Sequence, residues 1–225
     1  MQNYLIKSIG IINEGSIQTG DLLIKDGRIE KIATQIRSTP GACIEINGEG
    51  KWLFPGVIDD QVHFREPGLT HKASIATESR AAVAGGVTSF MEMPNTIPPA
   101  FTQELLENKY SIASRDSMAN YSFYMGVSNS NADDVLKTND KKREVAGIKI
   151  FMGASTGDLL VDNPSTLDRI FRESELLIAT HCEDERIIRQ NLEKIKASHR
   201  PLTTADHPLI RDEEACYSSS LYAIQ

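Results

Sequence analysis

The stretch WLFPGVIDDQVHFREPG, residues 52–68, decides how this chain of 225 residues is interpreted. It opens as an apolar run, after which polar and apolar residues alternate. The polar positions, each two residues apart, are Gln61, His63 and Arg65. Successive side chains of an extended strand point to opposite faces, so these three would share one face. A Pro-Gly pair at 67–68 would end the strand. The stretch therefore predicts a strand that carries an amide, an imidazole and a guanidinium at its carboxyl end.

Beyond this stretch the chain alternates between strand-like and helix-like segments, which is the pattern of βαβ units around a parallel sheet. The expected strands are Trp52–Ile58, Val87–Met93, Tyr121–Val127, Gly147–Met152 and Leu176–His181. The expected helices lie at 74–84, 102–114, 132–137, 165–173, 183–197 and 212–223. No expected strand is followed by a glycine-rich GxGxxG turn, which favours a TIM barrel over an open doubly wound sheet.

Chain length limits how much of such a barrel is present. A complete (β/α)8 barrel takes roughly 250 residues, so the segment 51–225 should hold about five strands of eight. We therefore expect this segment to be the N-terminal portion of a TIM barrel from a longer enzyme.

The first fifty residues have a different texture. Short alternating runs occur at Tyr4–Ile12, Asp21–Lys25, Arg28–Ile32 and Cys43–Ile46. Asp26-Gly27 lies between two of these runs, and Asp-Gly between apolar runs is a strong hairpin signal. Residues 1–50 are thus expected to form a small N-terminal β-sandwich segment. The predicted fold class is α/β, with this segment preceding the partial barrel.

The amino-acid composition limits the classes of partner that the chain can bind. The chain has 24 basic and 31 acidic residues and a pI near 5.3, so it lacks the basic surface that nucleic acids and anionic membranes require. No apolar run approaches the length of a membrane span, and no CxxC pair occurs among the three cysteines. These features indicate a cytoplasmic protein whose partner is a small-molecule substrate, and they leave a homo-oligomer open.

Three more polar residues fall near the ends of expected strands. Asn95 lies in Met93-Pro-Asn-Thr96, which would be an ordinary turn in an arbitrary protein. Lys149 lies within an apolar run, where an unpaired ammonium is costly, so it should snorkel, lose its proton or be modified. His181 ends the fifth expected strand, and in a barrel such a position is typical of a site residue.

These motifs together resemble a known family. The stretch 59–68, DDQVHFREPG, resembles the first metal-binding strand of the amidohydrolase superfamily, and its FREPG resembles that of the dihydroorotases. The MPNT at 93–96 and the HCED at 181–184 are similar to dihydroorotase segments. So is the segment 206–216, in which Arg211 is expected to be structural.

The resemblance implies reversible, metal-dependent hydrolysis of the cyclic amide of dihydroorotate to N-carbamoyl-aspartate, a step of pyrimidine biosynthesis. It implies zinc, as one or two divalent ions. The implied metal ligands are His63, Lys149 as a carboxylated lysine, His181 and, weakly, Gln61. Arg65 and Asn95 would bind the substrate carboxylate, because a guanidinium offers a planar pair of donors.

The chain departs from the family pattern at Gln61, where the superfamily has the first histidine of His-x-His. A neutral amide oxygen is a poorer zinc ligand than imidazole. The catalytic aspartate of the family is also not located, and we expect it beyond Gln225. The chain by itself is therefore expected to be inactive.

Two alternatives stay open. One is another cyclic amidohydrolase, of the hydantoinase or allantoinase type, although Arg65 argues against substrates that lack the carboxylate. The other is a catalytically silent dihydroorotase-like subunit, which the substitution at Gln61 favours.

Overall fold

The computed structural model describes residues 2–37, 41–153, 155, 157–198 and 200–225. The chain divides into two compact units, Met1–Val57 and Ile58–Gln225. The division lies a few residues after the boundary predicted near residue 50.

The N-terminal unit is a five-stranded sheet in the order β3-β2-β1-β4, with a short fifth strand that also pairs with β1. Its strands are β1 Tyr4–Asn13, β2 Ser16–Lys25, β3 Arg28–Ala33, β4 Ile44–Asn47 and β5 Trp52–Leu53. The predicted hairpin at Asp26-Gly27 is confirmed, because both residues have positive φ and Lys25 pairs with Arg28. The described part of this unit forms one separate sheet.

The expected strand Trp52–Ile58 is not continuous. Trp52–Leu53 pairs in parallel with β1 of the N-terminal sheet, and the first strand of the second sheet, β6, runs over Val57–Val62. Pro55-Gly56 lies between them. Proline has no N–H to donate to a ladder and glycine weakens a strand, which explains the break. The prediction of a single strand that ends in the polar trio was therefore wrong.

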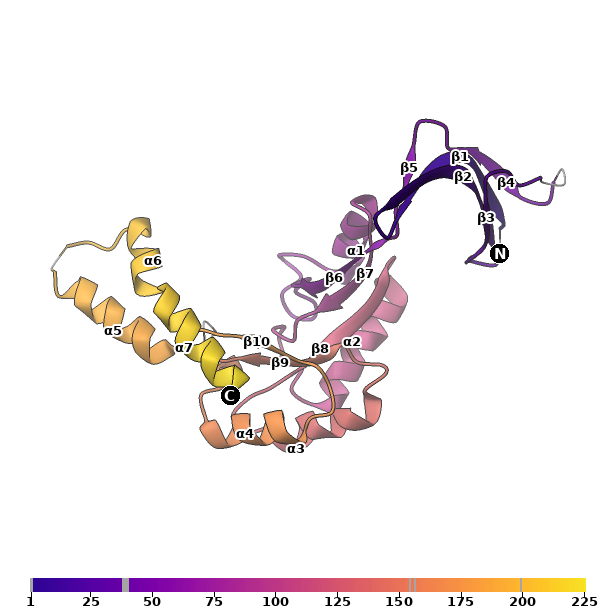
Figure 1. Cartoon of the computed structure of the whole chain (residues 1–225). Coiled ribbons are helices and arrows are strands. Elements are labelled where there is room, and N and C mark those ends of the chain that lie inside the picture. The colour runs from indigo at the N-terminus through magenta and orange to yellow at the C-terminus, as the bar shows by residue number, and fades with distance from the viewer. Residues whose placement is uncertain (1, 38–40, 154, 156, 199) are drawn as a thin grey trace. The chain divides into compact units, whose positions relative to one another are not determined.

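The second unit is built on a five-stranded sheet in the order β10-β9-β8-β7-β6, so strands that are consecutive along the chain are neighbours. The remaining strands are β7 Val87–Glu92, β8 Asn120–Gly126, β9 Gly147–Phe151 and β10 Ile178–His181. The pairs β7/β8, β8/β9 and β9/β10 are parallel. The sheet curls, as part of a barrel wall does (Figure 1).

Helices lie between successive strands of this sheet and after its last strand. Those between strands are α1 Ile75–Ala84, α2 Gln103–Asp116, α3 Ala132–Leu136 and α4 Pro164–Glu173; those after β10 are α5 Glu185–Lys196, α6 His207–Ile210 and α7 Glu213–Ile224. The 3-10 turns are η1 Lys137–Lys141, η2 Gly157–Leu159 and η3 Thr204–Asp206. Side-chain oxygens cap the longer helices and satisfy N–H groups that have no partner inside the helix. The capping residues are Ser74, Thr102, Asn163, Asp184 and Asp212. None of the helices in the described ranges is long and apolar enough to cross a membrane.

The core of this unit lies between the sheet and its helices. Strand residues such as Phe123 and Ile150 pack there with Leu106 of α2 and Ile170 of α4. Alternation along β9 turns its even-numbered residues toward this core, so Lys149 faces the other side of the sheet. That side corresponds to the interior of a barrel, the place where a site is expected.

Candidate active site

The predicted site residues lie within strands of the second sheet or in the loops that follow them. They come from β6, from β9 and β10, and from the loops that follow β6 and β7; they are Gln61, His63, Arg65, Asn95, Lys149 and His181. Because neighbouring strands run parallel, their carboxyl ends form one rim.

His63 follows directly after β6 and contacts Asn95 in the next loop. The His63 Nδ1 lies 2.8 Å from the Asn95 Oδ1. An amide oxygen only accepts, so this contact requires Nδ1 to carry the proton and leaves the Nε2 lone pair available. Burial lowers the pKa of His63, while the hydrogen bond that His63 donates to Asn95 opposes this shift, and the charges of Arg65 and Lys149 lower the pKa further. The imidazole is therefore neutral at pH 7 and can serve as a ligand or acceptor.

Arg65 is displaced from the strand face on which it was predicted. Strand β6 ends at Val62, and Arg65 has a left-handed backbone with φ of 70°. Its N–H donates to the Glu92 Oε1 at 3.1 Å, and its carbonyl accepts from the Leu69 N–H at 3.0 Å. The half-buried side chain thus leaves from a tight turn and not from an extended strand.

The loops after β6 and β7 are joined to each other. The Ile97 N–H donates to the Pro67 carbonyl at 3.1 Å, and the Met93 N–H donates to the Val62 carbonyl at 3.0 Å. Gly68 has φ of 83°, and a Cβ there would overlap the Ile97 carbonyl. The two loops that carry Arg65 and Asn95 therefore form one closely packed substructure.

Lys149 is 3% exposed, within β9. In the register of the sheet it lies beside Gly126 of β8 and Ala179 of β10. Its Nζ lies 5.1 Å from the ring centroid of Phe151, and burial lowers its pKa. In the described ranges no acidic side chain forms an ion pair with it.

His181 ends β10 and belongs to a chain of polar contacts that the sequence reasoning missed. Its Nε2 lies 2.9 Å from the Glu183 Oε2, and the same oxygen pairs with the Arg211 guanidinium. Burial raises the pKa of Glu183, but the hydrogen bonds from His181 and Arg211 outweigh it and hold that pKa below its ordinary value. The sequence signal that could have predicted this contact is the glutamate two residues after the histidine in HCED. Arg211 therefore orients the group that contacts His181.

Gln61 lies within β6 on the face that His63 continues, and its side chain is exposed. The described residues contain no group of three or more histidine, cysteine, aspartate or glutamate side chains placed to hold a metal ion.

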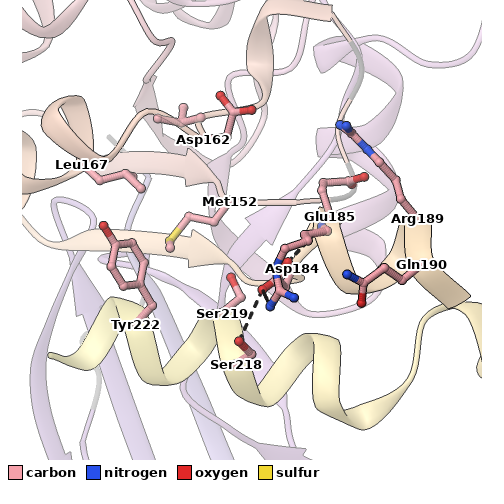
Figure 2. A pocket seen from close by; sticks show the side chains of 12 residues that line it. Met152, Asp162, Leu167, Asp184, Glu185, Arg189, Gln190, Ser218, Ser219 and Tyr222 are labelled. Carbon is pink, nitrogen blue, oxygen red and sulfur yellow. Dashed lines mark hydrogen bonds and ion pairs between the residues drawn. The ribbon is translucent and has the colours of Figure 1, made fainter.

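A separate cleft of about 600 Å³ opens beside β9, between α4, α5 and α7 (Figure 2). Met152, Leu167 and Tyr222 line its apolar part, while Arg189 and Gln190 lie at its polar side. None of the six predicted site residues lines this cleft. It is therefore distinct from the rim described above.

The chain is similar in sequence to known proteins. Residues 50–155 match the family model described as dihydro-orotase-like. The chain is 31% identical over 233 residues to an allantoinase of Solibacter usitatus, covering 99% of this chain and 50% of that protein. It is 34% identical over 198 residues to a dihydroorotase of Methanosarcina acetivorans, covering 87% of this chain and 41% of that protein.

A solved structure extends the likeness to the fold. The L-hydantoinase (dihydropyrimidinase) from Arthrobacter aurescens aligns with a TM-score of 0.90 and 26% identity over 100% of this chain and 50% of its own. This confirms the predicted α/β fold with part of a TIM barrel. The chain spans about half the length of the relatives it matches. It belongs to the cyclic amidohydrolase superfamily and carries a dihydroorotase-like segment.

Proposed function

We propose that this chain carries the substrate-carboxylate site, and part of the metal site, of a dihydroorotase, which reversibly hydrolyses the cyclic amide of dihydroorotate to N-carbamoyl-aspartate. The observation that carries the proposal is the pair of joined loops that brings Arg65 and Asn95 to the rim beside His63. A guanidinium and a neutral amide at one place suit a carboxylate attached to a small ring.

The hydrogen bond between His63 and Asn95 assigns a role to each end of the amide. Its oxygen accepts from His63, so the Asn95 NH2 group remains as the donor for a substrate. Arg65 supplies two parallel donors from the neighbouring loop. Fixing the carboxylate at two points would orient the ring and its amide before reaction. The loss of translational and rotational entropy would then occur on binding and would not add to the activation barrier.

The donors on this rim fit a divalent cation, which we propose to be zinc, as one or two ions. His63 would coordinate through Nε2, because its Nδ1 is held by Asn95. Lys149 and His181 would be the further ligands and Gln61 a weak one. When bound, such a cation supplies the Lewis acidity that polarises an amide carbonyl and acidifies water.

Lys149 suits reaction with carbon dioxide. Only a neutral amine attacks carbon dioxide; the new N–C bond gives a carbamate anion, and one proton is released. Burial lowers the pKa of Lys149, which raises the neutral fraction, and the absence of an ion pair in the described residues leaves the amine unengaged. The carbamate would supply two anionic oxygens as donors for the proposed cation or cations.

A second candidate is a cyclic amidohydrolase for an uncharged ring. It is favoured by the relatives named allantoinase and hydantoinase, which align with essentially the whole chain. A catalytically silent subunit is a third candidate, favoured by the exposed Gln61 in place of a histidine. If the protein is a dihydroorotase, as proposed first, we further propose that it is cytoplasmic and that its partner is a small-molecule substrate.

Calorimetric binding of dihydroorotate, hydantoin and allantoin to the zinc-supplemented 225-residue chain tests this proposal. We expect dihydroorotate to bind more tightly than the other two by about tenfold or more, because only it carries the carboxylate. Equal or tighter binding of hydantoin or allantoin would support the second candidate instead. Binding of none of the three would support the silent subunit.

A further inference from the structure

A buried ion pair links β7 to α2 directly beneath the candidate carboxylate site. Glu92 of β7 and Lys109 of α2 have side chains that are each 1% exposed, and the Lys109 Nζ lies 2.9 Å from the Glu92 Oε2. The same Nζ lies 5.0 Å from the ring centroid of Phe123. Both charged groups are therefore enclosed in the layer between the sheet and its helices.

Each member of the pair also holds one of the two site loops. The second carboxylate oxygen, Glu92 Oε1, accepts a hydrogen bond from the Arg65 N–H at 3.1 Å. The Lys109 Nζ donates to the Met93 carbonyl at 2.9 Å. Met93 lies two residues before Asn95, so the pair fixes the backbone close to both proposed carboxylate-binding residues.

Arg65 is the residue at which such a hold is needed. Its φ of 70° is a left-handed conformation that an L-residue other than glycine adopts only at an energetic cost. Conformations of this kind persist where surrounding contacts impose them, and they are frequent at functional sites. The hydrogen bond from Arg65 N–H to Glu92 is one such contact, because it fixes the peptide that enters the turn.

Packing alone does not explain a buried ion pair at this position. Two apolar side chains of similar size could join β7 to α2 without removing two charges from water, and such replacements are often neutral or stabilising. Burial raises the pKa of Glu92 and lowers that of Lys109, so the location works against the charged form of each. What an apolar pair cannot supply is an acceptor for the Arg65 N–H and a donor for the Met93 carbonyl.

We propose that Glu92 and Lys109 are positioning residues that hold the backbones of Arg65 and Met93 so that Arg65 and Asn95 converge on a substrate carboxylate. This inference rests on the proposed function and assigns the specificity for a carboxylate to a pair that does not touch the ligand.

Two double variants of the 225-residue chain separate positioning from packing. E92Q/K109M and E92M/K109M both remove the buried charges, but only the first keeps a side-chain oxygen that can accept from the Arg65 N–H. The first readout is hydrogen exchange of the Arg65 amide by NMR. The Ile148 amide, which donates to the Leu177 carbonyl, serves as the internal control for general opening. The second readout is the ratio of the dissociation constants for dihydrouracil, which lacks the carboxylate, and for dihydroorotate.

We expect E92M/K109M to speed Arg65 exchange relative to E92Q/K109M by about tenfold, with Ile148 unchanged between them. The carboxylate preference should fall in both variants, because both lack the Lys109 donor to the Met93 carbonyl, and it should fall by about tenfold more in E92M/K109M. Equal Arg65 exchange in the two variants, or an equal preference, would overturn the inference.

A measurement on the parent chain covers the case in which a variant does not fold. A scalar coupling between the Arg65 amide nitrogen and the Glu92 side-chain carboxylate carbon reports their hydrogen bond directly. Its presence supports the inference and its absence overturns it. If the parent shows no preference for the carboxylate, the proposed function fails, and the Arg65 exchange rates still decide whether Glu92 holds this backbone.

Discussion

Lys149 is the residue whose environment is most at odds with its chemistry. It is 3% exposed on a strand of apolar residues, and burial lowers its pKa. Leaving a charged ammonium there without a partner is costly, so a neutral amine or a modified one fits the site better. The proposed carboxylation would convert the buried amine into an anionic metal ligand.

The first residue-scale prediction concerns this modification. In buffer rich in carbon dioxide, native mass spectrometry should show a species heavier by one carbon dioxide, and Lys149→Met should abolish it. Lys142→Met is the matched control, because Lys142 is exposed and paired with Glu175. The modified fraction should rise with pH, since raising the pH increases the neutral amine that reacts. An unmodified mass at every pH would remove the bridging role of Lys149.

The sequence predicted which residues lie at or just after strand ends, but it did not predict where the backbone turns and redirects a side chain. The rim positions of His63, Asn95 and His181 followed from strand ends. The left-handed turn at Arg65 did not, because alternation assumes an extended backbone and β6 stops at Val62. The contact of Glu183 with Arg211 joins residues 28 apart in the chain, and no local pattern encodes such a contact.

At the scale of elements, the joined loops after β6 and β7 position the candidate site. Four of the five predicted barrel strands match β7 to β10 closely, since apolar runs bounded by turns indicate buried strands. The remaining predicted strand, Trp52–Ile58, is divided at Pro55-Gly56. Its high apolar content had suggested one continuous strand. The loops themselves could not be foreseen, because their packing depends on contacts between segments about thirty residues apart.

Gly68 provides the element-scale prediction. Gly68→Ala should destabilise the second unit and weaken dihydroorotate binding, because a Cβ would overlap the Ile97 carbonyl and separate the loops that carry Arg65 and Asn95. Gly86→Ala is the matched control, since Gly86 also has positive φ, at 92°, but its Cβ would meet nothing within 4 Å.

Both substitutions should cost about 1–2 kcal/mol for the left-handed backbone. Gly68→Ala should cost roughly a further 1–3 kcal/mol for the overlap. Chemical denaturation of both variants gives the difference. Equal destabilisation, together with unchanged binding, would mean that the two loops are not joined as described.

At the scale of the whole molecule, the second sheet has strands with a neighbour on one side only. In the described part of the chain β6 and β10 are the ends of the strand order. Large apolar side chains beside them are exposed, with Ile58 at 62% and Leu177 at 66%. Unpaired strand edges with apolar side chains favour pairing with another chain.

We therefore predict that the 225-residue chain self-associates. Its mass by light scattering should rise with protein concentration, and Leu177→Lys should reduce that rise, because charged side chains protect strand edges. Leu209→Lys on α6 is the control, since Leu209 is 59% exposed but lies on a helix and not in or next to a strand. A constant monomer mass at all concentrations would show that these edges do not drive association.

The central claim, that Arg65 grips a substrate carboxylate, is tested most directly by calorimetry of dihydroorotate and dihydrouracil binding to Arg65→Ala in the presence of zinc. Losing a desolvated charge-assisted pair should cost about 2–5 kcal/mol, so dihydroorotate binding should weaken by roughly thirtyfold or more. Dihydrouracil binding and the amount of bound zinc should stay unchanged. Arg80→Ala, at an exposed position of α1, should change neither affinity. If Arg65→Ala binds dihydroorotate as tightly as the parent chain does, the assignment of the carboxylate site is wrong.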